Sequence, residues 1–219
     1  MKNNELRLNA ILAFQLIRLL DFSFIKQHVE DPTAFANLLA AYLDPNQQTK
    51  RDGALALRAT MEHLIREIAA GMPVDCLICA NEADFDNARF YAESNGTPAV
   101  YLYRGEGRFT EGEGTAATVL KKSRVGIFQS VLAANDMILE LHRLIMRDTS
   151  YTYKGTYAVL DPERTRDAGI FESKGLKLRT VSLVTLAEVL VMSEKTKAIT
   201  LGEKLEMEEW LKEVTVPVP

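Results

Sequence analysis

The two cysteines of the chain form a C-x-x-C pattern, which in other proteins carries redox chemistry or binds metal. Cys76 and Cys79 lie inside an apolar run over residues 74–80. A redox C-x-x-C needs a partly exposed thiolate at the start of a helix. On a strand, residues three apart point to opposite faces, so these thiols would not meet. We therefore expect two small buried hydrophobic residues in a reducing compartment, without a disulfide.

Acidic side chains follow that run closely, and three histidines are scattered along the chain. Asp84 and Asp86 sit two residues apart and could bind a cation. Acids at the start of a helix are, however, common partners of its dipole, and we favour that interpretation. No pair of histidines has metal-ligand spacing. We expect surface or helix-face positions for His28, His63 and His142, and no bound metal.

Motifs of the common nucleotide-binding and hydrolytic folds are absent from the sequence. There is no G-x-S-x-G, no Walker lysine loop and no G-x-G-x-x-G after a strand. The segment 105–107 is a lone G-x-G preceded by arginine, which is too little to indicate a dinucleotide site.

The kind of secondary structure that the sequence predicts changes along the chain. The first third has apolar residues at helical spacing, and strands and helices alternate after it. Strands separated by single helices predict a parallel sheet covered on both faces. A glycine-rich, charged stretch over residues 104–114 predicts a mobile loop. We expect helices over residues 6–20, 31–44, 51–70, 86–95, 134–147, 165–174, 186–192 and 201–214. We expect strands over 74–80, 99–103, 124–128 and 156–160, and a last strand within 175–183.

One domain is expected, with a helical N-terminal cap over residues 1–72, a core over 73–192 and a helical C-terminal tail over 193–219. The net charge is −4 and the sequence pI is about 5.5. This balance argues against nucleic acid or an anionic membrane as partner. No apolar run reaches the roughly 20 residues that cross a bilayer. The first residues are too charged for a signal peptide, so we expect a cytoplasmic protein.

Four segments, over residues 95–104, 123–137, 158–161 and 174–190, resemble the type I phosphoribosyltransferases, and among them the orotate phosphoribosyltransferases. The resemblance implies an α/β fold: a doubly wound, mainly parallel sheet flanked by helices, with a helical N-terminal cap. Residues 123–137 fit the family's ribose-5-phosphate motif without a gap, and the order of elements agrees. The other segments are the lead into the catalytic loop, the next strand, and the closing strand with its T-L-x-x-(V/L)-L helix: residues 95–104, 158–161 and 174–190.

The resemblance also implies a site for phosphoribosyl pyrophosphate and a metal ion, and this chain departs from it. The two acids that hold the ribose hydroxyls in the family fall on Gln129 and Ser130. The small, hydroxyl-rich positions that receive the 5-phosphate are replaced by Ala133, Ala134, Asn135, Asp136 and Met137. Asp136 adds a like charge beside a dianion, at a cost of about 1–4 kcal/mol.

The remaining parts of the implied site are altered as well. The pyrophosphate loop over residues 80–86, which includes Asn81 and Glu82, has no glycine and three carboxylates. Arg104 and Arg108 are the candidates for the basic residues of the catalytic loop. On the base side, Pro162 follows Asp161 where the family has arginine.

Three functions fit these departures. The first is a catalytically inactive relative that binds a nucleotide-related ligand or a protein partner in the cleft at the carboxyl ends of the strands. The ligand-binding residues would then come from the altered motif and from the pyrophosphate loop: Gln129, Ser130, Ala133, Ala134, Asn135, Asp136, Met137, Asn81 and Glu82. The second is a divergent, Mg²⁺-dependent orotate phosphoribosyltransferase of pyrimidine biosynthesis. The third is a regulator that senses a nucleotide. We favour the first, and the resemblance makes a homodimer plausible.

Overall fold

The computed structural model describes residues 10–17, 32–43, 52–71, 73–79, 82–96, 99–105, 108–111, 123–133, 136–147, 151–162 and 179–212. The N-terminal part is helical, as predicted: residues 10–17 form one helix, followed by α3 (Pro32–Leu43) and α4 (Asp52–Gly71). Within the described residues, no helix combines the length and the apolar character needed to span a membrane.

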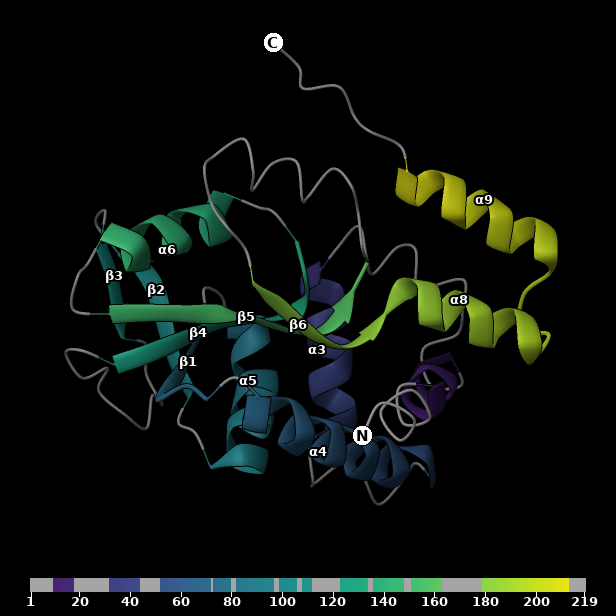
Figure 1. The fold of residues 1–219 in the computed structure, drawn as a ribbon, viewed down its shortest axis with the longest axis horizontal. Helices are drawn as coiled ribbons and strands as arrows, with labels where there is room; N and C mark the ends of the chain where they lie inside the picture. Colours follow the sequence, from purple (N-terminus) through teal and green to yellow (C-terminus); the bar gives the residue numbers. More distant parts are fainter. Residues whose placement is uncertain are drawn as a thin grey trace, which may run out of the picture.

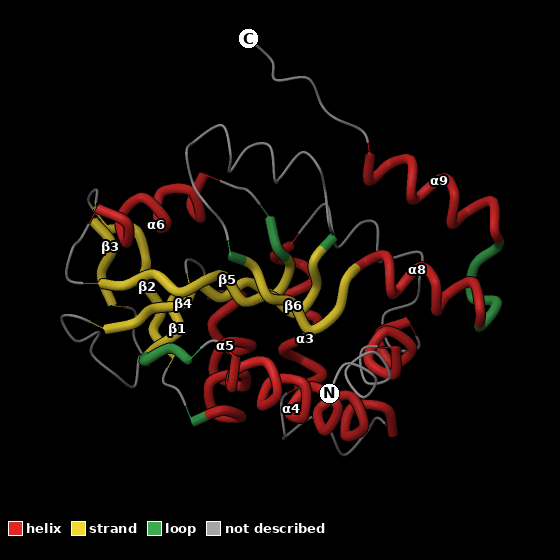
Figure 2. The backbone as a smooth tube through the Cα atoms, viewed as in Figure 1, coloured by secondary structure: helices red, strands yellow, loops and turns green. Residues whose placement is uncertain are grey.

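A six-stranded sheet forms the centre of the molecule, with the strand order β3-β2-β1-β4-β5-β6 (Figures 1 and 2). Neighbouring strands are parallel except β2 and β3, which pair antiparallel. The strands are β1 (Cys76–Cys79), β2 (Ala99–Gly105), β3 (Arg108–Glu111), β4 (Ser123–Val131), β5 (Tyr151–Asp161) and β6 (Thr180–Thr185).

Helices cover both faces of this sheet, because each strand of a parallel sheet buries two faces. One hydrophobic cluster joins α5 (Glu82–Asn95), α3, α4 and the helix over 10–17 to one face. A second cluster joins α6 (Asp136–Arg147) to the other face. The chain closes with α8 (Leu186–Lys195) and α9 (Leu201–Lys212). The predicted doubly wound α/β sheet with a helical N-terminal cap is confirmed.

The two cysteines lie on opposite faces of the sheet. Cys76 belongs to the cluster under α6, whereas Cys79 belongs to the cluster under α5. Both are buried and free. The prediction that they act as small hydrophobic residues without a disulfide is therefore confirmed.

Local sequence explains where several helices begin and end. Gly96 follows α5 with a φ of 76°, a left-handed conformation that favours glycine and ends the helix as predicted. Thr185 starts α8 with a capping box, since its Oγ1 accepts from the Glu188 amide and the Glu188 carboxylate accepts from the Thr185 amide. This exchange satisfies two amides that would otherwise lack partners.

Some predicted boundaries are wrong. The mobile loop predicted from residue 104 is instead part of a hairpin, because β2 continues to Gly105 and pairs with β3. Gly105, the last residue of β2, suits a hairpin as well as it suits a loop. The predicted pyrophosphate loop over 80–86 is also wrong from residue 82 onward, where α5 begins. β5 begins five residues early, at Tyr151, and the helix predicted over 165–174 lies outside the described residues.

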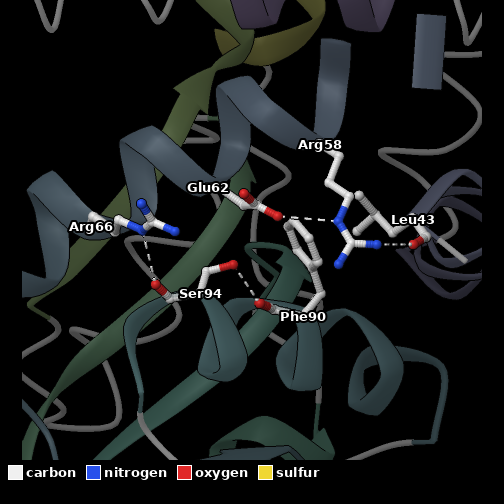
Figure 3. Close-up of polar contacts among 6 residues, drawn as sticks. All are labelled: Leu43, Arg58, Glu62, Arg66, Phe90 and Ser94. Carbon is white, nitrogen blue, oxygen red and sulfur yellow. Dashed lines mark hydrogen bonds and ion pairs between the residues drawn. The ribbon is translucent and has the colours of Figure 1, made fainter. Parts of the chain in front are cut away.

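Two arginines of α4 bind the last carbonyls of neighbouring helices (Figure 3). Arg58 Nη1 lies 3.4 Å from the carbonyl of Leu43 at the end of α3, and Arg66 Nε donates to the carbonyl of Ser94 near the end of α5 at 3.3 Å. Arg58 also lies over the Phe90 ring, 5.0 Å from its centroid, and pairs with Glu62 at 3.1 Å. Cations at helix carboxyl ends offset the helix dipole, so α4 holds the ends of α3, in the cap, and of α5, in the core.

Replacing Arg58 with alanine is expected to lower the free energy of unfolding by about 1–2 kcal/mol, because a half-buried stem, a ring contact and a helix cap are lost together. The Arg66→Ala variant should lose less than about 1 kcal/mol, because that side chain is exposed. Urea unfolding of both variants measures the difference. Equal losses would show that the Phe90 contact contributes nothing.

Candidate functional site

The candidate site lies where the strand order of the sheet reverses. β2, the next strand along the chain, pairs with one edge of β1. β4, which comes later, pairs with the other edge of β1. The helices that follow these strands, α5 and α6, cover opposite faces. In doubly wound sheets, ligands bind outside the carboxyl ends of the strands at such a reversal. We call this position, formed by the end of β1, residues 129–131 of β4 and the first turns of α5, the switch point.

β4 extends beyond β1 at the switch point. The last paired residues of the two strands are Ile78 and Ile127, whereas β4 continues to Val131. On the side of β1, the end of β4 therefore has no neighbouring strand. Side chains from the start of α5 supply hydrogen-bond partners there. The Asp84 carboxylate accepts a hydrogen bond from the Ser130 amide, with 2.7 Å between Oδ1 and N.

Ser130 and Asp84 are both buried, with exposed fractions of 0% and 6%. A carboxylate that is buried near an amide N–H is stabilised by the hydrogen bond but still repels other anions. Its charge also affects Cys79: burial, and secondly the Asp84 charge, raise the pKa of that thiol well above its ordinary value. Cys79 is therefore a neutral thiol, without the reactivity of a thiolate.

Asn87 connects three elements at the same place. Its Nδ2 donates to the carbonyl of Ala36 in α3 at 2.8 Å and to Ser130 Oγ at 2.9 Å. Asn87 lies one turn after Asp84 on α5, so both side chains face the end of β4. The N-terminal cap is thus joined by a buried polar contact to the residue that replaces the second family acid.

Gln129, which replaces the first family acid, is also buried, with 2% of its surface exposed. Its Nε2 donates to the carbonyl of Ala133 at 3.1 Å, in the segment that leaves β4. Both residues at the implied ribose position are therefore neutral and engaged with the protein itself. Neither offers a carboxylate to a hydroxyl or a metal ion.

The other predicted site residues are only partly described. Ala133 is half-buried. Asp136 and Met137 form the first turn of α6, Glu82 is the first residue of α5, and Arg104 and Arg108 lie on the paired strands β2 and β3. In the sheet order these strands are two and three positions from β4. Ala134, Asn135 and Asn81 lie outside the described residues.

The roles of Asp84 and Asn87 at the end of β4 are not predicted from the sequence. Asp84 was predicted as a partner of the helix dipole and Asn87 was not singled out. The available signal was the spacing of Asp84 and Asn87, three residues apart and so on one face of a helix. Nowhere in the described ranges do three or more histidine, cysteine or acidic side chains gather to hold a metal ion.

A second buried polar group lies under α6, away from the switch point. His142 is 2% exposed, its Nε2 lies 3.3 Å from Thr156 Oγ1, and the Tyr153 hydroxyl lies 2.8 Å from the same Oγ1. His142 is thus on the inner face of α6, which is the second of the two expected positions, a helix face and not the surface. His63 is exposed, as expected, and His28 lies outside the described residues. Burial lowers the pKa of His142 to about 4.

This burial predicts a loss of stability in mild acid. An unfolded histidine has a pKa of about 6.5, so between pH 6.5 and 4 the unfolded chain binds a proton that the folded chain does not. The contribution is complete above the unfolded pKa and is lost as the pH falls towards 4, by up to about 3 kcal/mol. In urea unfolding at pH 7, 5.5 and 4.5, His142→Gln should show a smaller loss than wild type. A His63→Gln variant is the control, and an unchanged slope in His142→Gln would contradict the assignment.

Known proteins resemble this chain in structure but not in sequence. No protein-family model matches the chain, and no curated protein matches it in sequence. Among solved structures, UMP synthase of Leishmania donovani matches with a TM-score of 0.55 and 17% identity over 73% of this chain. The match spans 34% of the UMP synthase chain, so this chain corresponds to about a third of that protein.

Two further structures are orotate phosphoribosyltransferases. That of Aeropyrum pernix has a TM-score of 0.49 and 16% identity, covering 72% of this chain and 84% of its own. That of Mycobacterium tuberculosis has a TM-score of 0.45 and 21% identity, covering 73% and 92%. At these identities a likeness shows the fold alone. With its doubly wound sheet, its reversal between β1 and β4 and its helical cap, the chain has the fold of a type I phosphoribosyltransferase.

Proposed function

We propose that this protein is a phosphoribosyltransferase-like protein without transferase activity, which binds a nucleotide-related ligand or a protein partner at the switch point. One observation carries the proposal. The two residues at the implied ribose position, Gln129 and Ser130, are neutral, buried and bonded to the protein itself. Neither of these two side chains supplies a carboxylate to a ribose hydroxyl or a cation.

Electrostatics supports the same conclusion. Transfer from phosphoribosyl pyrophosphate depends on neutralising a departing pyrophosphate, usually with a metal ion and basic residues. Here the end of β4 contacts a buried carboxylate, that of Asp84, which accepts a hydrogen bond from the Ser130 amide. A like charge a few ångströms from a phosphate costs about 1–4 kcal/mol. The site therefore favours a ligand that is less anionic than the family substrate.

The test is product formation from orotate and phosphoribosyl pyrophosphate with Mg²⁺, followed by absorbance and by chromatography for the nucleotide. We expect no turnover above the rate without protein. Saturable, protein-dependent turnover would establish instead the divergent Mg²⁺-dependent transferase, in which Gln129 and Ser130 hold the ribose hydroxyls.

We also propose a location, an oligomeric state and a limit on the partners of the protein. The proposal includes a cytoplasmic location. The resemblance implies a homodimer, which light scattering on the purified full chain tests. The proposal excludes nucleic acid as the partner, because the net charge of −4 disfavours it. An electrophoretic shift at low salt would count against this part.

A further inference from the structure

The helix α9 presents two leucines to solvent. Leu201 and Leu205 lie four residues apart and so share one face of the helix, and 56% and 51% of their surfaces are exposed. Among the α9 side chains whose burial the structure describes, Met207 alone is buried. A helix of 12 residues is marginal in water unless an apolar face packs against another surface. A partner on the outer face of α9 would therefore stabilise this helix.

The exposed face of α9 is also acidic. The helix carries four glutamates and two lysines, and Lys204 is bound to Glu194 of α8 at 2.6 Å. Glu209 continues the face of the two leucines one turn further on, Glu206 lies beside it, and both are exposed. Neither forms an ion pair with another residue that the structure describes. A surface that complements α9 combines apolar groups with positive charge.

The last two turns of α6 have this combination. Arg143 and Arg147 are exposed and lie one turn apart, and no ion pair joins either of them to a described residue. Leu144 and Met146 lie on the two sides of this arginine row and are 41% and 60% exposed. The opposite face of α6 is already buried against the sheet. The exposed face of α6 therefore matches that of α9 in apolar character and has the opposite charge.

The two faces belong to opposite ends of the molecule. In Figure 1, α6 lies over one end of the sheet, whereas α9 lies beyond α8 at the other end, and both are towards the top of the view. They do not meet within one chain. A second copy, turned by 180° about an axis perpendicular to that view, would bring its α9 to this α6 and its α6 to this α9. A two-fold arrangement of this kind forms both contacts at once.

We infer that the partner of α9 is a second copy of this chain, and that the acidic, apolar face of α9 packs against the basic, apolar face of α6 in that copy. The arginine stems cover the leucines, while the guanidinium groups reach the glutamates. The inference rests on the homodimer included in the function proposed above and assigns that dimer its contact surface.

Charge-reversal variants of the full chain, studied by analytical ultracentrifugation, test this surface. One variant carries Arg143→Glu with Arg147→Glu, and the other carries Glu206→Lys with Glu209→Lys. Each variant places like charges at both contacts, so its dimer dissociation constant should rise at least about tenfold. An equimolar mixture of the two variants should restore the dimer, because opposite charges then meet at both contacts.

The matched control reverses two charges elsewhere, with Arg89→Glu and Glu93→Lys together. These residues are exposed and lie one turn apart on α5, which covers the other face of the sheet from α6. The dissociation constant should stay within about twofold of wild type. Far-ultraviolet circular dichroism checks that each variant folds. Where a reversal prevents folding, the matching glutamine variant replaces it, which should weaken the dimer and make it less sensitive to salt.

A wild-type chain that is monomeric at about 0.1 mM would overturn both the proposed homodimer and this inference. A dimer that both reversed variants retain, or a mixture that does not restore the dimer, would overturn the contact surface alone. None of these results bears on the loss of transferase activity, which the orotate assay tests separately.

Discussion

Replacing Ser130 with aspartate, which restores a family acid, is expected to lower the free energy of unfolding by about 3–5 kcal/mol without creating a metal-dependent site. Ser130 is fully buried and its amide is bonded to the Asp84 carboxylate at 2.7 Å. A second carboxylate there would lack a partner of opposite charge among the described residues and would face a like charge. Urea unfolding at pH 7 measures the loss.

The Ser130→Ala variant is the control for the loss of the hydroxyl alone. It removes one acceptor of Asn87, whose Nδ2 keeps the carbonyl of Ala36, so about 1 kcal/mol should be lost. Ser130→Asp should lose more free energy of unfolding than Ser130→Ala. This difference should decrease as the pH falls, because protonation removes the added charge. A Ser130→Asp protein as stable as wild type would mean that the end of β4 is open to solvent or a cation.

The second large effect is expected at Gly126, in the middle of β4. A Cβ built there would lie 2.6 Å from Tyr157 Cε2 and 3.0 Å from Leu77 Cδ2, closer than carbon atoms pack. The Tyr157 ring is held by Tyr91, with ring centroids 5.5 Å apart, and is 1% exposed. Because the ring has little room to move, Gly126→Ala should cost about 2–3 kcal/mol through overpacking.

Gly202 in α9 provides the matched control, because a Cβ there would meet only Thr200 Oγ1, at 3.8 Å. Gly202→Ala should be neutral or stabilising by up to about 1 kcal/mol, since alanine favours a helix more than glycine does. The double variant Gly126→Ala with Tyr157→Leu should recover part of the loss, because the ring is the obstacle. Equal effects of the two glycine substitutions would contradict the packing described for β4.

The sequence predicts the order of strands and helices because each buried strand and amphipathic helix has its own periodicity. The run around Cys76 and Cys79 indicates a central strand, and Gly96 indicates the end of α5. The β2–β3 hairpin is not predicted, because glycines and charged residues occur both in tight connections between strands and in long loops.

The candidate site could be predicted only in part, for a different reason. The positions of Gln129 and Ser130 at the end of a strand follow from the motif, and their neutrality is visible in the sequence. Their partners are not, because Asp84 and Asn87 lie 46 and 43 residues from Ser130 along the chain. The free energy of such contacts depends on tertiary packing, which local periodicity does not encode.

Titration of the full chain with phosphoribosyl pyrophosphate in the presence of Mg²⁺, followed by calorimetry, tests the central claim most directly. The residues on β4 at the switch point are neutral, and a buried carboxylate contacts them. We therefore expect no saturable heat at millimolar ligand, with or without the metal. Saturable binding that requires Mg²⁺ would mean that the end of β4 does hold a sugar phosphate and its cation.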